Sequence, residues 1–448
     1  MENSLEADRI RVGMLIDDVE GTPYQQCTLT RDASQGALLS VPFVNGVEQF
    51  ELPSEWFDFG TASPPDSLLF ADPDGHVTLT GLRFRGTRGL VYSLGRLDAR
   101  VAIFGQPRKL EREYRVKTLR SRIDGLHHFA AFESIDIHLK RKADRFKVRV
   151  TLDPKGVVEA ESGAFTVAIR ATAPWDAMDG VGFTTQTDAE LETTCADGAT
   201  VDDHIQAQWA VRALLSLVQG TQVRWRAHKV LDDQFPTWML SGEAQKPSFV
   251  DVLYQRTAGD FVAPPAETAD LRWPAIRLAD LGASGLQRWL DLYSDPLIRR
   301  AVEPAVEVIN GATRFVEPRL LMTVLGLDAM GYFRDPLRKP QTPLNTQIER
   351  CLWASGLDVS ALGSVRQVAM AIAHVNNDIK HPDRDHRPDG VVMRLVADLA
   401  LLVMRMQTAE LLGVQDKFRR VRDGGVDTVV QAFERNGVVI QDKRFLST

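Results

Sequence analysis

"SVRQVAMAIAHVNNDIKHPDRDHRPDG", residues 364–390, joins a helical apolar pattern to a cluster of His, Asp and Asn. The apolar residues recur at spacings of three and four, which is the period of one helix face. They are Val365, Val368, Ile372, Val375 and Ile379. Pro382 disfavours helical geometry at the residue before it. We therefore expect an amphipathic helix that ends at His381, with its last carbonyls and the imidazole accessible.

The polar face of this helix is the first candidate site. At 100° per residue, His374, Asn377, Asp378 and His381 fall together, almost opposite Ile372. We expect these side chains to face solvent, a loop or another subunit. An accessible imidazole can act as an acid or a base near neutral pH. A solvated helix end explains the same pattern, so both interpretations stay open.

Two further segments predict helices that pack with this one. Residues 316–333 and 391–413 carry apolar stripes of the same period, and Gly413 supplies a stop signal after the second stripe. Three amphipathic helices joined by loops predict a helical bundle after about residue 270.

The chain before this bundle predicts mainly strands. Asp-Pro-Asp-Gly at 72–75 and Asp-Pro-Lys-Gly at 153–156 are turn sequences between extended patterns, and a helical spacing appears only around residues 204–220. The expected fold class is α+β and multidomain. It comprises a β-rich N-terminal domain over residues 1–270, an all-α bundle over 271–413 and a C-terminal tail over 414–448.

Composition narrows the protein class. The chain has 448 residues, 44% of them hydrophobic and 25% charged, which is typical of globular multidomain proteins. Neither a signal peptide nor an apolar membrane span is evident, so we expect a cytoplasmic protein without a membrane partner. Three scattered cysteines, Cys27, Cys195 and Cys351, indicate neither a disulfide framework nor a cysteine zinc site.

Positive charge is concentrated in one region although the net charge of the chain is −7. Residues 107–150 hold thirteen Lys or Arg against six Asp or Glu. Within them, "DRFKVRV" alternates Arg145, Lys147 and Arg149 with apolar residues, so a strand here would bury one face and present three cations on the other. Such a face can bind the phosphates of a nucleic acid, and a solvated outer sheet face is the alternative.

The order of these features resembles the ApeA-like branch of the HEPN-domain proteins. The resemblance runs from about residue 10 to residue 413, and its short core is Asn377-x-x-x-His381. Members are helical-bundle ribonucleases, or inactive relatives, that serve in bacterial antiphage defence and abortive infection. The resemblance implies a metal-independent ribonuclease domain controlled by an N-terminal sensor of a phage-derived or host signal. It also implies RNA as the partner, such as tRNA or phage or host transcripts, and a homodimer through the helical domain.

The family motif carries an Arg that is absent here. Asn377 and His381 align with the polar residue and the His of that motif, whereas Asn376 stands at the Arg position. His381 would transfer protons, and Asn376 could give only amide hydrogen bonds, so Lys380 and Arg384 are the expected cations for the phosphate. A second Arg-to-His spacing, from Arg122 to His127 or His128, occurs in the β-rich half, and we assign it no role.

Two other readings compete with catalysis. A non-catalytic HEPN protein would use the same helix to bind a nucleotide or RNA, or would act as a scaffold. The stretch 381–386 ends in Asp-His as one metallohydrolase pattern does, but it has Asp383 where that pattern requires His, so we expect no metal. No cofactor-binding motif is evident.

Overall fold

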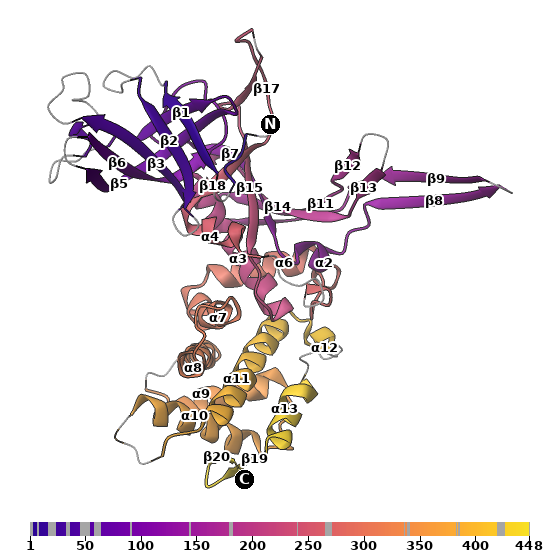
Figure 1. Cartoon of the computed structure of the whole chain (residues 1–448). Coiled ribbons are helices and arrows are strands. Elements are labelled where there is room, and N and C mark those ends of the chain that lie inside the picture. The colour runs from indigo at the N-terminus through magenta and orange to yellow at the C-terminus, as the bar shows by residue number, and fades with distance from the viewer. Residues whose placement is uncertain are drawn as a thin grey trace.

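The computed structural model describes residues 3–6, 9–16, 24–32, 36–44, 54–57, 64–89, 92–142, 145–178, 182–239, 241–264, 271–335, 337, 341–381, 383, 386–418 and 426–447. A β-rich region forms one half of the molecule and a group of helices forms the other (Figure 1). The predicted α+β class is therefore correct.

A closed barrel forms the first part of the β-rich half. Its six antiparallel strands pair in the circular order β1-β2-β3-β6-β5-β4. The strands are β1 (Ile10–Leu15), β2 (Gln26–Asp32), β3 (Gly36–Val44), β4 (Ser67–Asp72), β5 (Gly75–Gly89) and β6 (Tyr92–Ile103). The predicted turn at 72–75 joins β4 to β5, and Asp72 Oδ1 accepts hydrogen bonds there from the backbone N–H of Asp74 and Gly75. Alternate residues of the strands fill a barrel core of their own.

The sheet continues beyond the barrel because the far end of β6 also pairs with β18. The order from there is β18-β15-β7-β14-β11-β10, with antiparallel pairing throughout. These strands are β18 (Val250–Tyr254), β15 (Trp225–Leu231), β7 (Val116–Ile123), β14 (Asp188–Ala199), β11 (Phe165–Thr172) and β10 (Val157–Ser162). The short helix α2 (Leu126–Ala130) follows β7, and η2 (Gln255–Thr257) and α4 (Ala258–Val262) follow β18.

In the part of the chain that the structure describes, three two-stranded hairpins project from this half, and none of them pairs with the main sheet. They are β8 (Ile135–Lys142) with β9 (Arg145–Leu152), β12 (Trp175–Met178) with β13 (Gly182–Thr185), and β16 (Pro236–Trp238) with β17 (Ala244–Pro247). The β8–β9 hairpin extends farthest from the body of the molecule (Figure 1). At its base the backbone N–H of Asp153 donates to Ser134 O, 2.9 Å away, where the predicted turn at 153–156 returns the chain to the sheet.

A buried histidine lies in the extended sheet. The ring of His228 contacts Ser121 Oγ through Nδ1 at 2.7 Å and Thr257 Oγ1 through Nε2 at 2.9 Å. A neutral imidazole satisfies both contacts, because one ring nitrogen donates and the other accepts. Burial lowers the pKa of His228 to about 3, so this ring is a structural group and not a proton donor at neutral pH.

Acid should therefore destabilise the fold. An unfolded chain binds a proton at His228 below about pH 6.5, whereas the folded chain does not until about pH 3, so the stability falls as the pH drops between these values. The free energy of unfolding from urea titrations should decrease by about 1.4 kcal/mol per pH unit for this group. In His228→Gln the slope between pH 6.5 and 5 should be shallower by about that amount. An unchanged slope would contradict the buried neutral state of His228.

Helix α3 (Val201–Gln219) connects the two halves. The sequence predicted this helix over residues 204–220, and it begins at a capping box formed by Thr200 and Asp203 and ends at Gly220, whose φ is 69°. One side of α3 packs on β14, β7 and β11, and the other contacts α6, α7 and α11. Buried residues of the extended sheet, α3 and the helical half consequently form one continuous hydrophobic core.

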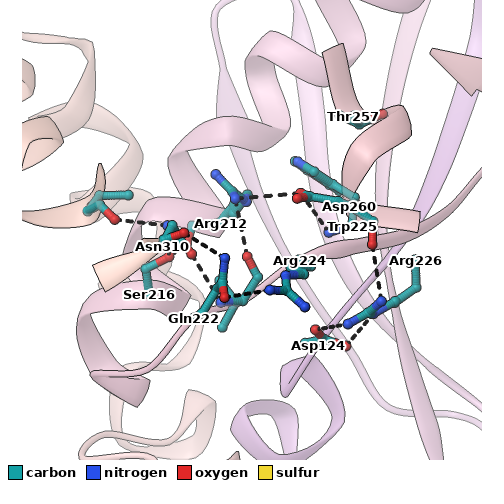
Figure 2. Close-up of polar contacts among 12 residues, drawn as sticks. Asp124, Arg212, Ser216, Gln222, Arg224, Trp225, Arg226, Thr257, Asp260 and Asn310 are labelled. Carbon is teal, nitrogen blue, oxygen red and sulfur yellow. Dashed lines mark hydrogen bonds and ion pairs between the residues drawn. The ribbon is translucent and has the colours of Figure 1, made fainter. Parts of the chain in front are cut away.

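Polar contacts reinforce this connection (Figure 2). Asn310, the residue after α7, accepts at Oδ1 from the backbone N–H of Val223 at 3.0 Å and donates from Nδ2 to Ser216 Oγ at 3.0 Å. On the β side, Asp260 accepts from the backbone N–H of Trp225 at 3.2 Å and lies 3.6 Å from the buried Arg212 guanidinium. The end of α7 is thus fixed to the segment that leads into β15.

The helical half contains the three predicted helices. They are α8 (Val316–Phe333), α10 (Val365–Lys380) and α11 (Gly390–Leu411), and the residues of their predicted stripes lie in or against the core. The sequence did not assign α6 (Leu278–Ser294), α7 (Pro296–Ile309) or α9 (Leu344–Ser355), which pack with them. The tail adds α12 (Gln415–Phe418), α13 (Val426–Arg435) and a hairpin of β19 (Val438–Gln441) and β20 (Arg444–Ser447).

Candidate functional site

The end of α10 lies where the sequence predicted it. The helix begins at Ser364, whose hydroxyl forms a capping box with Gln367, and its last residue is Lys380. His381 is extended, with φ −116° and ψ 93°, and its backbone N–H donates to Asn377 O at 3.0 Å. Both Lys380 and His381 are exposed, so an ammonium and an imidazole are accessible at this helix end.

The expectation that the polar face meets solvent, a loop or another subunit needs correction at Asp378, which the C-terminal hairpin covers, whereas His374 and Asn377 are half-buried. Strand β20 of the C-terminal hairpin packs on α10, and the Arg444 guanidinium forms an ion pair with Asp378, whose side chain is buried. Asn376 is only 1% exposed, and its Nδ2 donates to Asn377 Oδ1 at 3.4 Å. Asn377 is half-buried. In this conformation Asn376 cannot contact a bound phosphate from the surface.

The Asp378–Arg444 ion pair makes a stability prediction. Replacing Arg444 with Met removes the cation and leaves a buried carboxylate with weaker compensation, which should cost about 2 kcal/mol of unfolding free energy. Lys443→Gln on the same hairpin is the matched control, because Lys443 is exposed. Urea unfolding followed by circular dichroism measures both. Equal stability of the two variants would mean that the hairpin does not hold α10 through this contact.

A pocket between α7, α8 and α9 adds a residue that the sequence did not suggest. Its volume is about 460 Å³, and side chains of α7, α8 and α9 line it, among them Arg300, Asp328 and Gln347. Burial raises the pKa of the Asp328 carboxyl, and the positive charges of Lys380 and Arg300 partly oppose that rise. A carboxyl with a raised pKa near an exposed Lys is a combination found at acid–base sites. Only the fold brings Asp328 and Lys380 together.

Part of the predicted set lies outside the described residues. Pro382, Arg384 and Asp385 belong to this group, so the role of Arg384 and the expectation of no metal at 381–386 stay predictions. Among the residues whose positions are described, no three His, Cys, Asp or Glu side chains are grouped so that they could hold a metal ion.

The β8–β9 hairpin carries the basic segment that the sequence singled out. Its two strands pair over eight residues each, so it is about 25 Å long at a rise of ~3.3 Å per residue. We call it the basic ribbon. The register pairs His138 with Arg149 and Lys140 with Lys147, and all four side chains are exposed.

Directly paired residues share a face of a ribbon, so these four basic side chains lie on one face. His138 Nε2 lies 2.8 Å from Asp136 Oδ2 on the same face, nearer the base. At the far end the backbone pairs Lys142 with Arg145, and the side chain of Arg145 lies outside the described part of the chain.

The other face of the basic ribbon corrects the prediction that its apolar residues are buried. Ile137, Leu139 and Val148 are 58%, 70% and 56% exposed, because the hairpin projects from the body (Figure 1) and none of the described segments covers these side chains. Alternation was read correctly from the sequence, but burial depends on what covers the strand.

The neighbouring β12–β13 hairpin presents two aromatic rings. Trp175 and Phe183 are 63% and 49% exposed, and their rings are stacked with centroids 6.2 Å apart. Both hairpins leave the same end of the extended sheet, since the start of β10, the end of β11 and the start of β14 lie together in the register. A row of cations and a pair of exposed rings therefore share one end of the sheet.

The cysteines, the membrane-spanning potential of the helices and the similarity to known proteins complete the description of these sites. The three cysteines are free and buried, and burial raises the pKa of the Cys27 and Cys351 thiols to about 12, so these two are not reactive thiolates. Within the described part of the chain, no helix is long and apolar enough to cross a membrane. Comparisons with protein-family models, with curated proteins and with solved structures found no match.

Proposed function

We propose that this protein binds single-stranded RNA through the basic ribbon. The observation that supports the proposal is the exposed cationic face on which Lys140, Lys147, Arg149 and His138 lie together. Like charges directly opposite each other weaken a strand pair, so the Lys140–Lys147 pair favours an anionic partner. Phosphates of a nucleic-acid backbone match such a row of exposed cations.

Single-stranded RNA fits this end of the molecule better than an RNA duplex does. Side chains cannot read the deep, narrow major groove of A-form RNA, whereas unpaired bases stack on exposed aromatic rings. Trp175 and Phe183 provide such rings beside the ribbon. We therefore assign phosphate binding to the ribbon and base stacking to the aromatic hairpin.

The stacking role predicts a loss of affinity in Trp175→Ala. Removing one base-stacking ring should weaken the binding of an oligouridylate about tenfold. In addition, RNA should quench the tryptophan fluorescence of the wild type, and this quenching should be largely lost in the variant. Trp353→Ala is the matched control, because Trp353 on α9 is similarly exposed at 68% but lies in the helical half. Fluorescence anisotropy of labelled RNA measures the affinity. Equal affinity of the two variants would remove the aromatic hairpin from the binding site.

A second candidate function is RNA cleavage of the HEPN type at the end of α10. The observation that favours it is the exposed His381 and Lys380 at this helix end, with the charge of Lys380 acting on the Asp328 carboxyl. In this proposal His381 transfers a proton and Lys380 stabilises charge on the phosphate, while the substrate's own 2′-OH is the nucleophile. Asn377 is half-buried and lies one helical turn before His381. Its backbone oxygen accepts a hydrogen bond from the backbone N–H of His381, so Asn377 is close enough to help orient this residue.

The resemblance to the HEPN-domain proteins suggests a biological role for RNA cleavage by the helical half. The helical half would act on RNA in a cytoplasmic antiphage response, as a homodimer, and the β-rich half would respond to a phage-derived or host signal. The continuous core through α3 offers a physical route between the two halves. The non-catalytic alternative keeps RNA binding and assigns the α10 end a binding or scaffold role, in keeping with the buried Asn376 and Asp378.

A further inference from the structure

A polar pocket lies at the same end of the extended sheet as the basic ribbon. It has a volume of about 190 Å³ and opens between the end of β7, helix α2 and the start of β14. Arg122, His127 and His128 all line it, so the fold brings together the Arg-to-His pair that had no role on spacing alone. We call it the histidine pocket.

Two ion pairs fix the walls of the histidine pocket. Arg226 donates from Nε to Asp124 Oδ1 and from Nη2 to Asp124 Oδ2, both at 2.6 Å, and Figure 2 shows this pair. The same guanidinium also donates to the backbone oxygens of Ala263 and Asp260. Across the pocket Arg122 Nη2 donates to Asp188 Oδ2 at 2.9 Å, and the Arg122 side chain is still 47% exposed. Arg122 therefore retains donors that can reach a ligand.

The two imidazoles stand against each other inside these walls. The rings of His127 and His128 have centroids 3.8 Å apart and are tilted by 42°. Nε2 of His128 is buried and has no hydrogen-bond partner among the described residues. A buried polar atom without a partner costs free energy, so a rotation of this ring that brings Nε2 to a ligand oxygen in the pocket would remove that cost.

The charges around the pocket favour an anion. Arg122 and Arg226 balance Asp124 and Asp188, and Arg272 and Arg277 add further positive charge near His128. The surroundings of the two rings are consequently net positive. A phosphate group is small enough for about 190 Å³ and accepts several hydrogen bonds at once.

We infer that the histidine pocket binds one phosphate group of the RNA strand that the basic ribbon holds. The inference rests on the proposed function, because the ribbon supplies the strand. Arg122 would donate to the phosphate from its free edge, and one imidazole would donate to a second oxygen. The pocket would thus set the register of the strand at the base of the ribbon, where the ribbon joins the sheet.

The titration of His128 provides a signature for this contact. Burial, and after it the positive charges of His127, Arg272 and Arg277, lower the pKa of His128 to about 4. The other charged groups facing the pocket are Arg122 on β7, Asp124, Asp188 on β14 and Arg226 on β15. A bound phosphate adds negative charge beside the rings and should raise the pKa of His128.

Imidazole NMR of the full chain tests the inference. The protein is labelled at the histidine ring carbons and titrated with an oligouridylate of about 16 nucleotides, with uridine monophosphate, and with inorganic phosphate. We expect the oligouridylate to shift the His127 and His128 resonances over the concentration range in which it binds, and to raise the pKa of His128. His204 is the internal control, since its ring is buried against Thr193 and Val116 and should not shift. Mononucleotide and phosphate should need at least tenfold higher concentrations, because they lack the ribbon contacts.

Substitutions complete the test. Arg122→Gln should abolish the shifts and lower RNA affinity about fivefold near 0.1 M salt, the effect of one lost phosphate contact. His128→Phe keeps an aromatic ring at this position but removes the imidazole, so the RNA-dependent His128 resonance should disappear while the protein stays folded. Arg83→Gln on the barrel should change neither the imidazole shifts nor the RNA affinity.

The outcomes separate the inference from the proposed function. RNA binding with a ribbon-dependent salt slope but without His127 or His128 shifts overturns the inference and leaves the proposed function standing. Saturation by mononucleotide or phosphate at the concentration of the oligonucleotide overturns it too, since the pocket would then be an independent nucleotide or phosphate site. Absence of any RNA binding overturns both.

Discussion

Replacing Lys140, Lys147 and Arg149 with glutamine should lower the affinity for single-stranded RNA about a hundredfold near 0.1 M salt. Each cation that contacts a phosphate releases about 0.7 of a counterion from a single strand, so three lost contacts reduce the slope of log K against log salt by about 2. The three side chains are exposed on a projecting hairpin, so the substitutions should leave the unfolding free energy nearly unchanged. Anisotropy of labelled oligouridylate at several salt concentrations gives both numbers.

Two controls distinguish this local effect from others. Ile137→Thr with Leu139→Thr changes the exposed apolar face of the same ribbon and should not alter the salt slope. Arg83→Gln, Arg366→Gln and Lys443→Gln together remove the same net charge from exposed positions elsewhere. If this second triple variant lost as much affinity as the ribbon variant, net charge would explain the binding and the ribbon would have no special part in it.

His381→Ala should reduce RNA cleavage on the order of a hundredfold if the end of α10 is a ribonuclease site. Loss of a positioned proton-transfer group commonly costs that factor or more. Lys380→Ala should reduce the cleavage rate by a comparable factor, because it removes the exposed ammonium next to His381 in the chain. Rates are measured on total RNA with purified protein, with and without EDTA, and cleavage that persists in EDTA agrees with a metal-independent reaction.

The fold provides a suitable control for this experiment. Arg366 is exposed at the opposite end of α10, so Arg366→Ala should retain full activity and a normal circular dichroism spectrum. Cleavage and phage protection that are unchanged in His381→Ala would contradict catalysis at this helix end and favour the binding or scaffold alternative. Activity that requires a divalent cation would contradict the metal-independent mechanism.

Local patterns predicted the α+β class and four of the long helices. Apolar spacing located α3, α8, α10 and α11, and Pro382 marked the end of α10, because these signals act within a few residues. The Asp-Pro-Asp-Gly turn between β4 and β5 followed from the side chain of Asp72 bonding to its own turn. The barrel closure through β5 and β6 was not predicted, since it depends on pairing between strands and not on any one segment.

The candidate sites depended more on tertiary contacts. Helical periodicity correctly placed Asp378 on a different face of α10 from Ile372. It could not show the ion pair between Asp378 and Arg444, because Arg444 lies 66 residues later in the chain. The same limit applies to Asn376, whose burial follows from the packing around α10. Likewise, Arg122 and His127 acquire a shared environment only when β14 and β15 bring Asp188 and Arg226 beside them.

Photocrosslinking of RNA to the full chain shows which residues of the protein contact the strand. An oligouridylate that contains 5-iodouridine is irradiated in complex with the protein, and the crosslinked residues are identified by mass spectrometry. RNA binding through the basic ribbon predicts crosslinks in the two hairpins, at residues 135–152 and at Trp175 or Phe183, and their loss when Lys140, Lys147 and Arg149 are replaced. Crosslinks confined to the barrel or to the helical half, unaffected by those replacements, would contradict it.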